Sequence, residues 1–509
     1  MPQTYLSPGV YVEEVDKGTK PIESVGTSLA AFVGITAEAT LKKRDPQTGE
    51  LAPYASCLNK ATLVTSWTQY TEIFGEFVSG AYLPDAVYNY FNNGGALCYI
   101  VSIKAMDQAD SRAKAAEVTI KGKGKDSLKV TAKTPGPDGN DLSIMIKHGE
   151  EETFTMRVGN EVKSGLTMKR GENYVGDAAF ETVNITVASA ANLPDEGSYT
   201  LSGGGIQPLT VEDFVGDVAE RTGLGALEAL DSIRLILCPD VMTGYYGSEG
   251  AKKRIKMVQE AMIAQCERSR YRFAILDTPP DLKAQQALEW REYINFNTSY
   301  AALYYPWLEV YDFSEGPNDT KFMPPSGHVA GVYNRVDADR GVHKAPANEI
   351  IRGTNDLQIQ LSKAEQDVLN PIGVNCIRAF PNRGINIWGA RTLSNDGSWR
   401  YVNVRRLFIM VEASLDAGMQ WVVFEPNDTT LWAKVRRDVT SYLRTVWLSG
   451  ALFGTTPEQA FYVKCDEELN PLEIRDLGQL IIEVGLAPVK PAEFVIFRIS
   501  QWAGANAEA

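Results

Sequence analysis

The feature that most limits the fold is an alternation of short apolar runs with longer amphipathic segments after about residue 207. The apolar runs lie at 233–238, 273–276 and 300–305, and segments of helical length at 250–269 and 282–295 separate them. Strands that are each followed by a helix pair in parallel, because the helix carries the chain back across the sheet. The pattern therefore predicts a parallel α/β sheet with crossover helices.

The segment 118–206 has a different character. Its apolar runs are short, alternate with polar residues and are separated by Gly, Pro, Asn and Asp. Such runs are typical of antiparallel strands joined by tight turns. Because the segment lies between two α/β regions, we interpret it as an inserted domain.

The predicted fold class is a multidomain chain that combines α/β and α+β parts around a parallel-sheet core. The expected segments are an N-terminal strand arm (1–25), a discontinuous α/β middle domain (26–117 and 207–357), an inserted small antiparallel β domain (118–206), a C-terminal α+β domain (358–487) and a C-terminal strand arm (488–509).

Five further expectations concern secondary structure. The sequence predicts a polar helix at 107–117 and a long irregular connection at 306–345, which is rich in Pro, Gly and polar residues. In the C-terminal domain we expect helices at 401–417 and 428–447, with a strand at 420–424 between them.

Charge and composition exclude several classes of function. The chain has 50 Lys and Arg against 64 Asp and Glu, a formal net charge of −14, so it repels the phosphate backbone of nucleic acids. It has no run of about 18 apolar residues, and direct membrane insertion is not expected. Six widely spaced cysteines and three histidines argue against a disulfide framework or a zinc site. We expect no metal and no cofactor.

One acidic residue has the position of an enzyme site. Asp277 stands at the carboxyl end of an expected parallel strand, where open α/β sheets bind ligands. The alternative is that Asp277 caps the next turn or helix, with Pro279 and Pro280 fixing the chain direction, and the sequence favours this cap. Motifs of nucleotide-binding loops, serine hydrolases and zinc proteases are absent, so no catalytic residue is assigned.

A second polar group surrounds two histidines. His328 and His343 flank a segment that contains Asp337, Asp339 and Arg340. The spacing does not fit a nucleophile and its base, and we interpret these side chains as polar interface residues.

Both ends of the chain carry strand-forming apolar residues flanked by Pro and Gly. The strand-forming residues are Val10, Tyr11, Val12 and Val15 near the start and Phe494, Val495, Ile496, Phe497 and Ile499 near the end. The expected hinges are Gly18, Pro21, Pro488 and Pro491. An isolated strand leaves amides and apolar side chains unpaired, so each arm either packs on its own subunit or adds to a neighbour's sheet.

The reach of such arms is large. At roughly 3.3 Å per residue, an arm of about 20 residues spans about 65 Å. Two arms at opposite ends of the chain suffice to link one copy to several others in an open lattice.

The expected helix at 428–447 has two unlike faces. An apolar stripe contains Trp432, Val435, Val439, Tyr442 and Val446. The opposite side carries Lys434, Arg437, Ser441 and Arg444. From the residues alone this basic stripe is a solvated face, which is the usual meaning of such charges. Arg405 and Arg406 form a competing basic pair.

Several segments resemble contractile tail sheath proteins. In chain order they are YLSPGVYVEEVDKGTKPIESVGTSLAAFVG, ILDTPP, SYAALYYPWLEV, PPSGHVAGVYNRVDADRGVHKAPANE, LNPIGVNCIRAFPNRGINIWGARTLS, WRYVNVRRL and PAEFVIFRI. The resemblance covers both ends and most of 207–509, and it is weak across 118–206, where such proteins carry variable outer insertions. The family occurs in contractile-tailed phages, R-type bacteriocins and phage-tail-like contractile injection systems.

The resemblance implies a structural, force-generating subunit and no enzyme. Such subunits stack as hexameric rings around an inner tube, exchange strand arms, and contract with energy stored in a metastable extended lattice. The implied partners are copies of the chain itself, the inner tube protein, the baseplate and tail-terminator or cap proteins. The basic helix face would lie toward the tube. The particle would be assembled in the bacterial cytoplasm and released.

Two other functions stay open at this point. One is an α/β enzyme with a site at Asp277. The other is a passive shell or adhesin subunit that shares only the arms.

Overall fold

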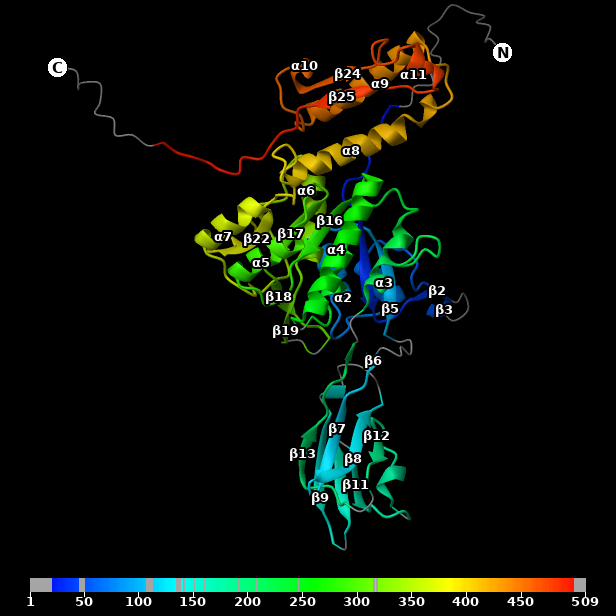
Figure 1. The fold of residues 1–509 in the computed structure, drawn as a ribbon, viewed down its shortest axis with the longest axis vertical. Helices are drawn as coiled ribbons and strands as arrows, with labels where there is room; N and C mark the ends of the chain where they lie inside the picture. The colour runs from blue at the N-terminus through cyan, green and yellow to red at the C-terminus, as the bar shows by residue number, and fades with distance from the viewer. Residues whose placement is uncertain are drawn as a thin grey trace, which may run out of the picture. The chain divides into compact units, whose positions relative to one another are not determined.

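The computed structural model describes residues 21–498 except 45–50, 107–112, 134–138, 141, 151, 160, 172, 190–191, 207–208, 246, 315 and 317–318. The chain forms two compact units (Figure 1). The large unit comprises 27–340 and 344–405. Among the described residues, the small unit comprises 21–26, 341–343 and 406–498.

A nine-stranded sheet forms the centre of the large unit. Its six middle strands are parallel, and the strands at both edges run antiparallel to their neighbours. From one edge to the other the strands are β20 (Glu349–Ile350), β23 (Gly384–Ile387), β22 (Val374–Phe380), β17 (Ala301–Tyr305), β16 (Phe273–Asp277), β15 (Leu235–Leu237), β1 (Ala30–Thr36), β5 (Cys98–Ala105) and β4 (Thr62–Val64). The predicted α/β sheet is therefore present, as a mixed sheet.

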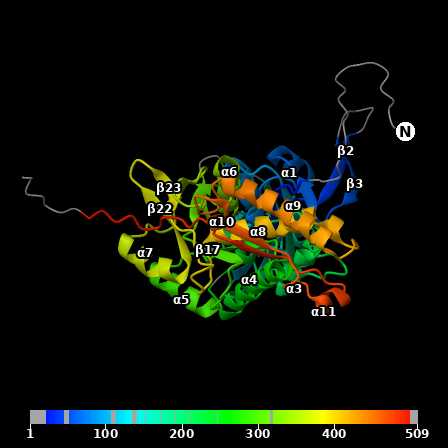
Figure 2. The ribbon, with the colours of Figure 1, turned by 90° about the horizontal axis from the view of Figure 1, so that it is seen from above.

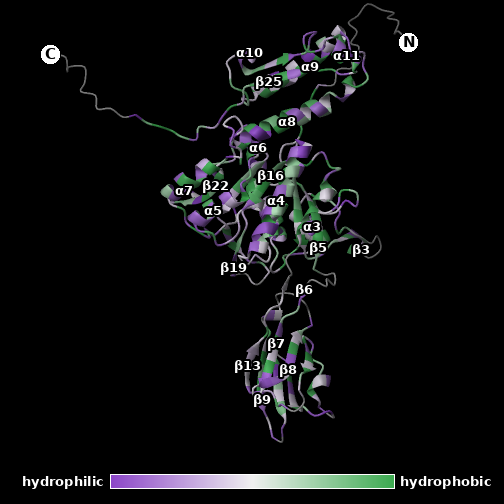
Figure 3. Cartoon of the chain, viewed as in Figure 1, coloured by the Kyte–Doolittle hydropathy of each residue, from purple (hydrophilic) through white to green (hydrophobic). Residues whose placement is uncertain are grey.

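The middle strands are mostly apolar because helices pack on them. Every residue of β1, β16 and β17 is buried, and Figure 3 shows hydrophobic residues on β16. Both α4 and α6 contact β16. The helices of the large unit are α1 (Trp67–Phe74), α2 (Leu83–Asn92), α3 (Val211–Val215), α4 (Glu249–Ser269), α5 (Ala284–Ile294), α6 (Ser326–Arg340) and α7 (Lys363–Leu369).

The stretch 306–345 is not the irregular connection that the sequence predicts. It contains β18 (Leu308–Tyr311) and β19 (Thr320–Met323), which pair antiparallel, and then α6. The short β21 (Asp356–Leu357) pairs with β18. The prediction was wrong because prolines in this stretch mark the boundary of an element: Pro324 and Pro325 directly precede α6, where proline is tolerated.

Two small antiparallel sheets with a core of their own lie between β6 (Ala113–Lys114) and β14 (Gly205–Ile206). One sheet contains β11 (Glu161–Leu166), β10 (Phe154–Val158), β9 (Ser143–His148) and β13 (Gly197–Thr200). The other contains β12 (Val183–Val187), β8 (Lys125–Ala132) and β7 (Glu117–Gly122). Where the chain enters and leaves this region, β6 and β14 pair with each other.

Two expectations near these sheets need comment. The predicted helix at 107–117 is wrong for 113–117, because β6 and the start of β7 occupy those positions; 107–112 lie outside the described residues. Strands β22 and β23 belong to the large sheet, although the sequence analysis groups them with the C-terminal domain from 358. The domain boundaries remain predictions. A separate hairpin is formed by β2 (Thr40–Arg44) and β3 (Leu51–Ser56).

In the small unit, helix α9 (Thr429–Leu448) packs on β24 (Phe461–Lys464), which pairs with β25 (Glu483–Leu486) (Figures 1 and 2). The other helices are α10 (Pro457–Ala460), α11 (Leu472–Asp476) and α8 (Val402–Gly418), which belongs to the small unit from Arg406 onward. The two expected helices are therefore present. The strand expected at 420–424 is wrong, because the chain reverses there through a 3-10 turn over Gln420–Val422.

Candidate functional site

The acidic residue at the end of β16 is a structural cap. Asp277 is 3% exposed, and its Oδ1 accepts a hydrogen bond from the backbone N–H of Ser326, 2.9 Å away, at the start of α6. Burial raises the pKa of Asp277 to about 7. The sequence analysis predicts a cap on the next turn or helix; the capped helix is α6, much further along the chain. The carboxylate thus binds a backbone N–H of the protein itself rather than a ligand.

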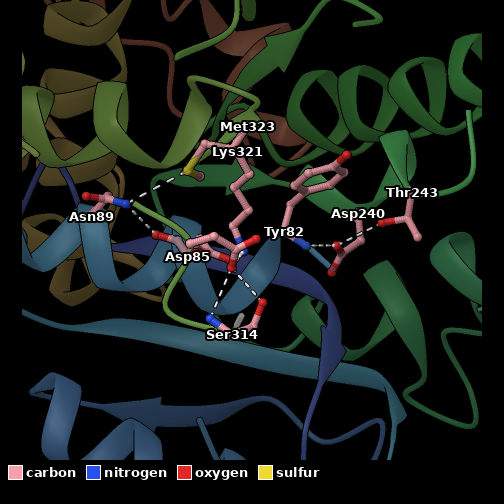
Figure 4. Close-up of polar contacts among 9 residues, drawn as sticks. Tyr82, Asp85, Asn89, Asp240, Thr243, Ser314, Lys321 and Met323 are labelled. Carbon is pink, nitrogen blue, oxygen red and sulfur yellow. Dashed lines mark hydrogen bonds and ion pairs between the residues drawn. The ribbon is translucent and has the colours of Figure 1, made fainter. Parts of the chain in front are cut away.

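A second strand-end acid, which the sequence analysis missed, has the same role. Asp240 follows β15 and is 1% exposed. It accepts hydrogen bonds from the backbone N–H of Tyr82 at 2.5 Å and from the hydroxyl of Thr243 at 3.1 Å (Figure 4). It also accepts one from the backbone N–H of Ile35 at 2.6 Å. Tyr82 precedes α2 and supplies no side-chain cap of its own, so Asp240 caps that helix.

Near the start of α2, a lysine joins two carboxylates (Figure 4). Lys321 Nζ lies 3.0 Å from Asp85 Oδ2 and 3.0 Å from Asp312 Oδ1. Asp312 also accepts hydrogen bonds from the backbone N–H and the hydroxyl of Ser314. Burial raises the pKa of Asp85 to about 6 against the opposing effect of Lys321. The lysine fills the space between the carboxylates, and the group fastens the segment after β18 to α2.

These acids explain why the carboxyl edge of the sheet is not an enzyme site. Their oxygens already bind helix N-termini or Lys321, and they are buried. A signal for Asp240 existed in the sequence, because an acid at the end of an apolar run, as at Asp277, or shortly after one, as at Asp240, marks this edge. In the described part of the chain, no three His, Cys, Asp or Glu side chains gather as metal ligands.

Within the group around the histidines, Asp339 and Arg340 are exposed and Asp337 and His343 are partly exposed, whereas His328 is not on the surface. His328 is fully buried within α6, and neither ring nitrogen has a hydrogen-bond partner among the residues that the structure describes, so its assignment as an interface residue was wrong. Burial lowers the pKa of His328 to about 3. Asp337, further along α6, accepts a hydrogen bond from the Thr27 hydroxyl at 2.5 Å.

The apolar stripe of α9 is the core of the small unit. All of its predicted members are buried, together with Leu431 and Leu443. They pack with Leu407 and Val411 of α8 and with Phe461 of β24. Asp428 caps the helix by accepting a hydrogen bond from the backbone N–H of Leu431 at 2.7 Å. Figure 3 shows hydrophilic and hydrophobic residues alternating along α9.

The opposite face of α9 is exposed as a row of polar side chains. The row contains Lys434, Arg437, Ser441 and Arg444. Arg437 is 58% exposed and pairs with the carboxylate of Asp438 at 2.9 Å. The contact of this row with an inner tube stays a prediction.

The competing basic pair does not lie on the surface. Arg405 is 6% exposed and Arg406 is 3% exposed. The guanidinium of Arg405 lies 3.6 Å from the ring centre of Trp399 and 4.5 Å from that of Tyr300, and it donates to the Ser299 hydroxyl at 2.9 Å. Arg405 is thus a packing residue that joins the start of α8 to its neighbours through cation–π contacts.

The N-terminal strand arm lies largely outside the described residues. Val10, Tyr11, Val12, Val15 and Gly18 fall among residues that the structure does not describe, and their roles remain predictions.

The base of this arm is described. Pro21 is exposed, but Ile22 is buried in the core of the small unit, and the N–H of Val25 donates to the Ser414 hydroxyl at 3.0 Å. Pro21 and Ile22 line one side of a cavity of about 250 Å³ whose other wall is α9 from Arg437 to Thr445. Any hinge of the arm therefore lies at Pro21 or before it.

The C-terminal arm is described to residue 498. Pro488 forms a bridge with Leu452, and the N–H of Val489 donates to the carbonyl of Ala451 at 3.2 Å. Residues 489–498 are not paired as a strand with any described part of the chain. The exposed fractions are 71% for Phe494, 70% for Val495, 78% for Ile496 and 83% for Phe497. Pro491 lies in this stretch, and Ile499 lies outside the described residues; the hinge and strand roles remain predictions.

No helix in the described ranges is both long enough and apolar enough to cross a lipid bilayer.

Comparisons with known protein families agree with these features. Residues 219–393 match the phage tail sheath protein central domain, and residues 394–501 match the phage tail sheath C-terminal domain. The tail sheath protein of Burkholderia phage BcepMu is 24% identical over 97% of this chain and 96% of its own length. The matches to the tail sheath proteins of Vibrio phage KVP40 (26% identical) and Salmonella phage ViI (29%) cover 40% of this chain and only 30% and 31% of those proteins.

Solved structures give the same result. The PVC sheath complex of an extracellular contractile injection system, in the contracted state, is 25% identical with a TM-score of 0.59, covering 98% of this chain and 99% of that one. The contracted helical sheath of the anti-feeding prophage has a TM-score of 0.60 at 24% identity and covers 98% and 100%.

The fold and the family matches together define a structural component of phage tails or phage-tail-like particles, not an enzyme. The chain belongs to the phage tail sheath family.

Proposed function

We propose that this chain polymerises as stacked hexameric rings around an inner tube and contracts to drive the tube through a target envelope. The contracted state of the PVC and anti-feeding prophage sheaths supports contraction. Energy would be stored in the interfaces of a metastable extended lattice, with no nucleotide consumed. The other partners would be the baseplate and the tail-terminator or cap proteins. The particle would assemble in the bacterial cytoplasm before its release.

The observation that carries this proposal is the exposed apolar segment at the C-terminus. Four consecutive large apolar residues, 494–497, are each at least 70% exposed, so both faces of the extended chain are open to water. Such a segment is an aggregation hazard unless it has a partner. A neighbouring copy supplies one by β-strand addition.

The small unit contains a sheet suited to receive such a strand. It has only two strands, β24 and β25, and a two-stranded sheet is marginally stable alone. Its outer edges carry no further strand from the described part of the chain. We therefore propose that arms from neighbouring copies extend the β24–β25 pair.

The inner tube contact is assigned to the exposed face of α9. Its cations stand on a chain with a net charge of −14, and exposed ion pairs contribute about 0–1 kcal/mol each. Weak contacts of this kind suit a partner that must be released during contraction.

Electron microscopy of the purified protein tests the assembly. The full chain should form long cylinders, whereas deletion of 1–20 or of 490–509 should leave folded monomers without cylinders. Cylinders from either truncated chain would overturn arm exchange. Compact shells from the full chain would instead favour a passive shell protein.

A charge variant tests the tube contact separately. Substituting Lys434, Arg437 and Arg444 with Glu should weaken co-assembly with the tube and spare empty cylinders. The matched control replaces three exposed lysines of the large unit, Lys60, Lys253 and Lys363, with Glu. Equal tube binding by both triple variants would refute the assignment.

A further inference from the structure

The turn between α8 and α9 presents a cluster of apolar side chains to solvent. Trp421 is 38% exposed, Val423 is 59% exposed and Phe424 is completely exposed. Single exposed apolar residues are ordinary, but a cluster on one short turn marks an interaction surface.

This turn is held rigidly. The N–H of Glu425 donates to the carbonyl of Val422 at 3.1 Å. The Asn427 side chain accepts a hydrogen bond from Trp432 Nε1 and donates one to the carbonyl of Gln479, both at 2.8 Å. The apolar tip is therefore fixed on the core of the small unit.

Phe424 is held in an unfavourable backbone conformation. Its φ is +69°, a left-handed value that bulky residues rarely adopt and that strains the backbone. Packing within the described chain does not account for this conformation, because the side chain is completely exposed to solvent. A strained backbone that holds an aromatic ring in solvent indicates that the ring contacts another molecule.

The far end of α9 carries a second apolar surface. Leu448 is 69% exposed and Phe453 is 74% exposed. The N–H of Phe453 donates to the carbonyl of Ala487 at 2.8 Å, so this surface lies at the base of the C-terminal arm. A helix of 20 residues is about 30 Å long, and the two apolar surfaces therefore lie at opposite ends of α9.

The two ends differ in charge. From Asp416 to Ala433 the sequence contains three exposed acids, Asp416, Glu425 and Asp428, and no Lys or Arg. From Thr445 to Pro457 it contains neither an acid nor a Lys or Arg. Two exposed cations adjoin this second end, Arg444 one helical turn before Leu448 and Lys490 at the base of the arm, together with one exposed acid, Glu458.

We propose that the turn around Phe424 of one copy packs against the Leu448 and Phe453 surface of a second copy, in a head-to-tail contact distinct from arm exchange. Three exposed acids lie beside the first surface, whereas two cations and one acid adjoin the second, and this difference favours the pairing over like with like. Two different surfaces make a heterologous contact, which generates a ring or an open helical polymer rather than a two-fold dimer. The inference rests on the proposed self-assembly and adds a second interface to it.

Phe424→Gly is the decisive variant, because glycine relieves the positive φ while it removes the ring. The isolated monomer should melt at the same temperature as the wild type or higher, and the concentration needed for tube-free cylinders should rise by about tenfold. Arg270→Gly is the matched control: Arg270 is also exposed, has a φ of +62° and ends α4 in the large unit. It should leave that concentration unchanged.

Further variants identify the partner. Phe453→Ser should raise the same concentration, and the double variant should be no worse than the stronger single one, because both remove one contact. Glu425→Lys should weaken assembly and Lys490→Glu should restore it.

The outcomes separate the two proposals. A wild-type chain that forms no cylinders contradicts the proposed function itself. Wild-type cylinders with a normal concentration for Phe424→Gly overturn the head-to-tail contact alone. Normal empty cylinders with lost tube binding would show that the turn contacts the tube, which also overturns the inference. The head-to-tail contact would also be overturned by additive effects in the double variant, or by a failure of Lys490→Glu to restore assembly.

Discussion

The two units of this protein differ in which side chains they bury and which they leave exposed. The large unit buries carboxylates and supplies each with a partner: Asp240 and Asp277 cap helices, and Asp85 pairs with Lys321. The small unit has an apolar core around α9 but leaves Phe424, Phe453 and the segment 494–497 in solvent. The large unit supplies these carboxylates with partners of its own, whereas we infer that neighbouring copies complete the small unit.

The largest effect on stability is expected from the large unit. Asp240→Ala would leave the backbone N–H groups of Ile35 and Tyr82 without their acceptor and should lower the free energy of unfolding by about 3 kcal/mol. Chemical denaturation of the monomer measures this loss. Asp240→Asn keeps one acceptor oxygen and should lose less. A loss below about 1 kcal/mol for the alanine variant would break the comparison, because the buried acid would then not hold the unit together.

An effect of intermediate size should depend on pH. The pKa of buried His328 is lowered to about 3, so the unfolded chain takes up a proton near its ordinary value of about 6.5 while the folded chain does not. Stability contributed by the neutral ring is thus present above that value and is lost as the pH falls below it. His328→Leu should remove this loss, raising the free energy of unfolding by about 2 kcal/mol more at pH 5 than at pH 8.

The control for His328 is Tyr333→Phe, a buried position on the same helix that hydrogen-bonds Tyr304. It should destabilise the protein equally at both pH values. An equal effect of His328→Leu at pH 5 and pH 8 would show that the ring is accessible to protons in the folded state.

The smallest effect is expected on the exposed face of the small unit. Arg437→Gln removes a half-exposed pair with Asp438 and should change the free energy of unfolding by less than about 0.5 kcal/mol. Thermal melting of the monomer checks this. A loss above about 1 kcal/mol would mean that the face supports the fold of its own unit, and the contrast between the units would weaken.

Periodicity predicted the elements whose environment is local. The strands around 273–276 and 300–305 and the helices near 250–269 and 428–447 follow from runs of apolar residues that face one core. Predictions failed where long-range pairing decides the structure. The strands β18 and β19 are short and depend on each other, and residues 420–424 read as a strand because Val422, Val423 and Phe424 are β-formers.

The candidate site was predicted in part. The apolar stripe of α9 and the position of Asp277 were read from spacing alone. The partners of Asp277, Asp240 and Lys321 could not be predicted from spacing, because each bond joins residues far apart in the chain. The burial of Arg405 could not be predicted either. Two adjacent arginines usually lie on the surface, and the sequence does not show that the ring of Trp399 packs on the Arg405 guanidinium.

The pairing of β6 with β14 has a consequence for how such a chain can be altered. These two strands bind each other where the chain enters and leaves the region of β7 to β13, and that region has its own core. The two ends of the region are therefore held side by side by backbone hydrogen bonds. A foreign domain whose termini lie close together could replace the region between β6 and β14. A polymer of such chains would display many copies of a chosen binder or enzyme.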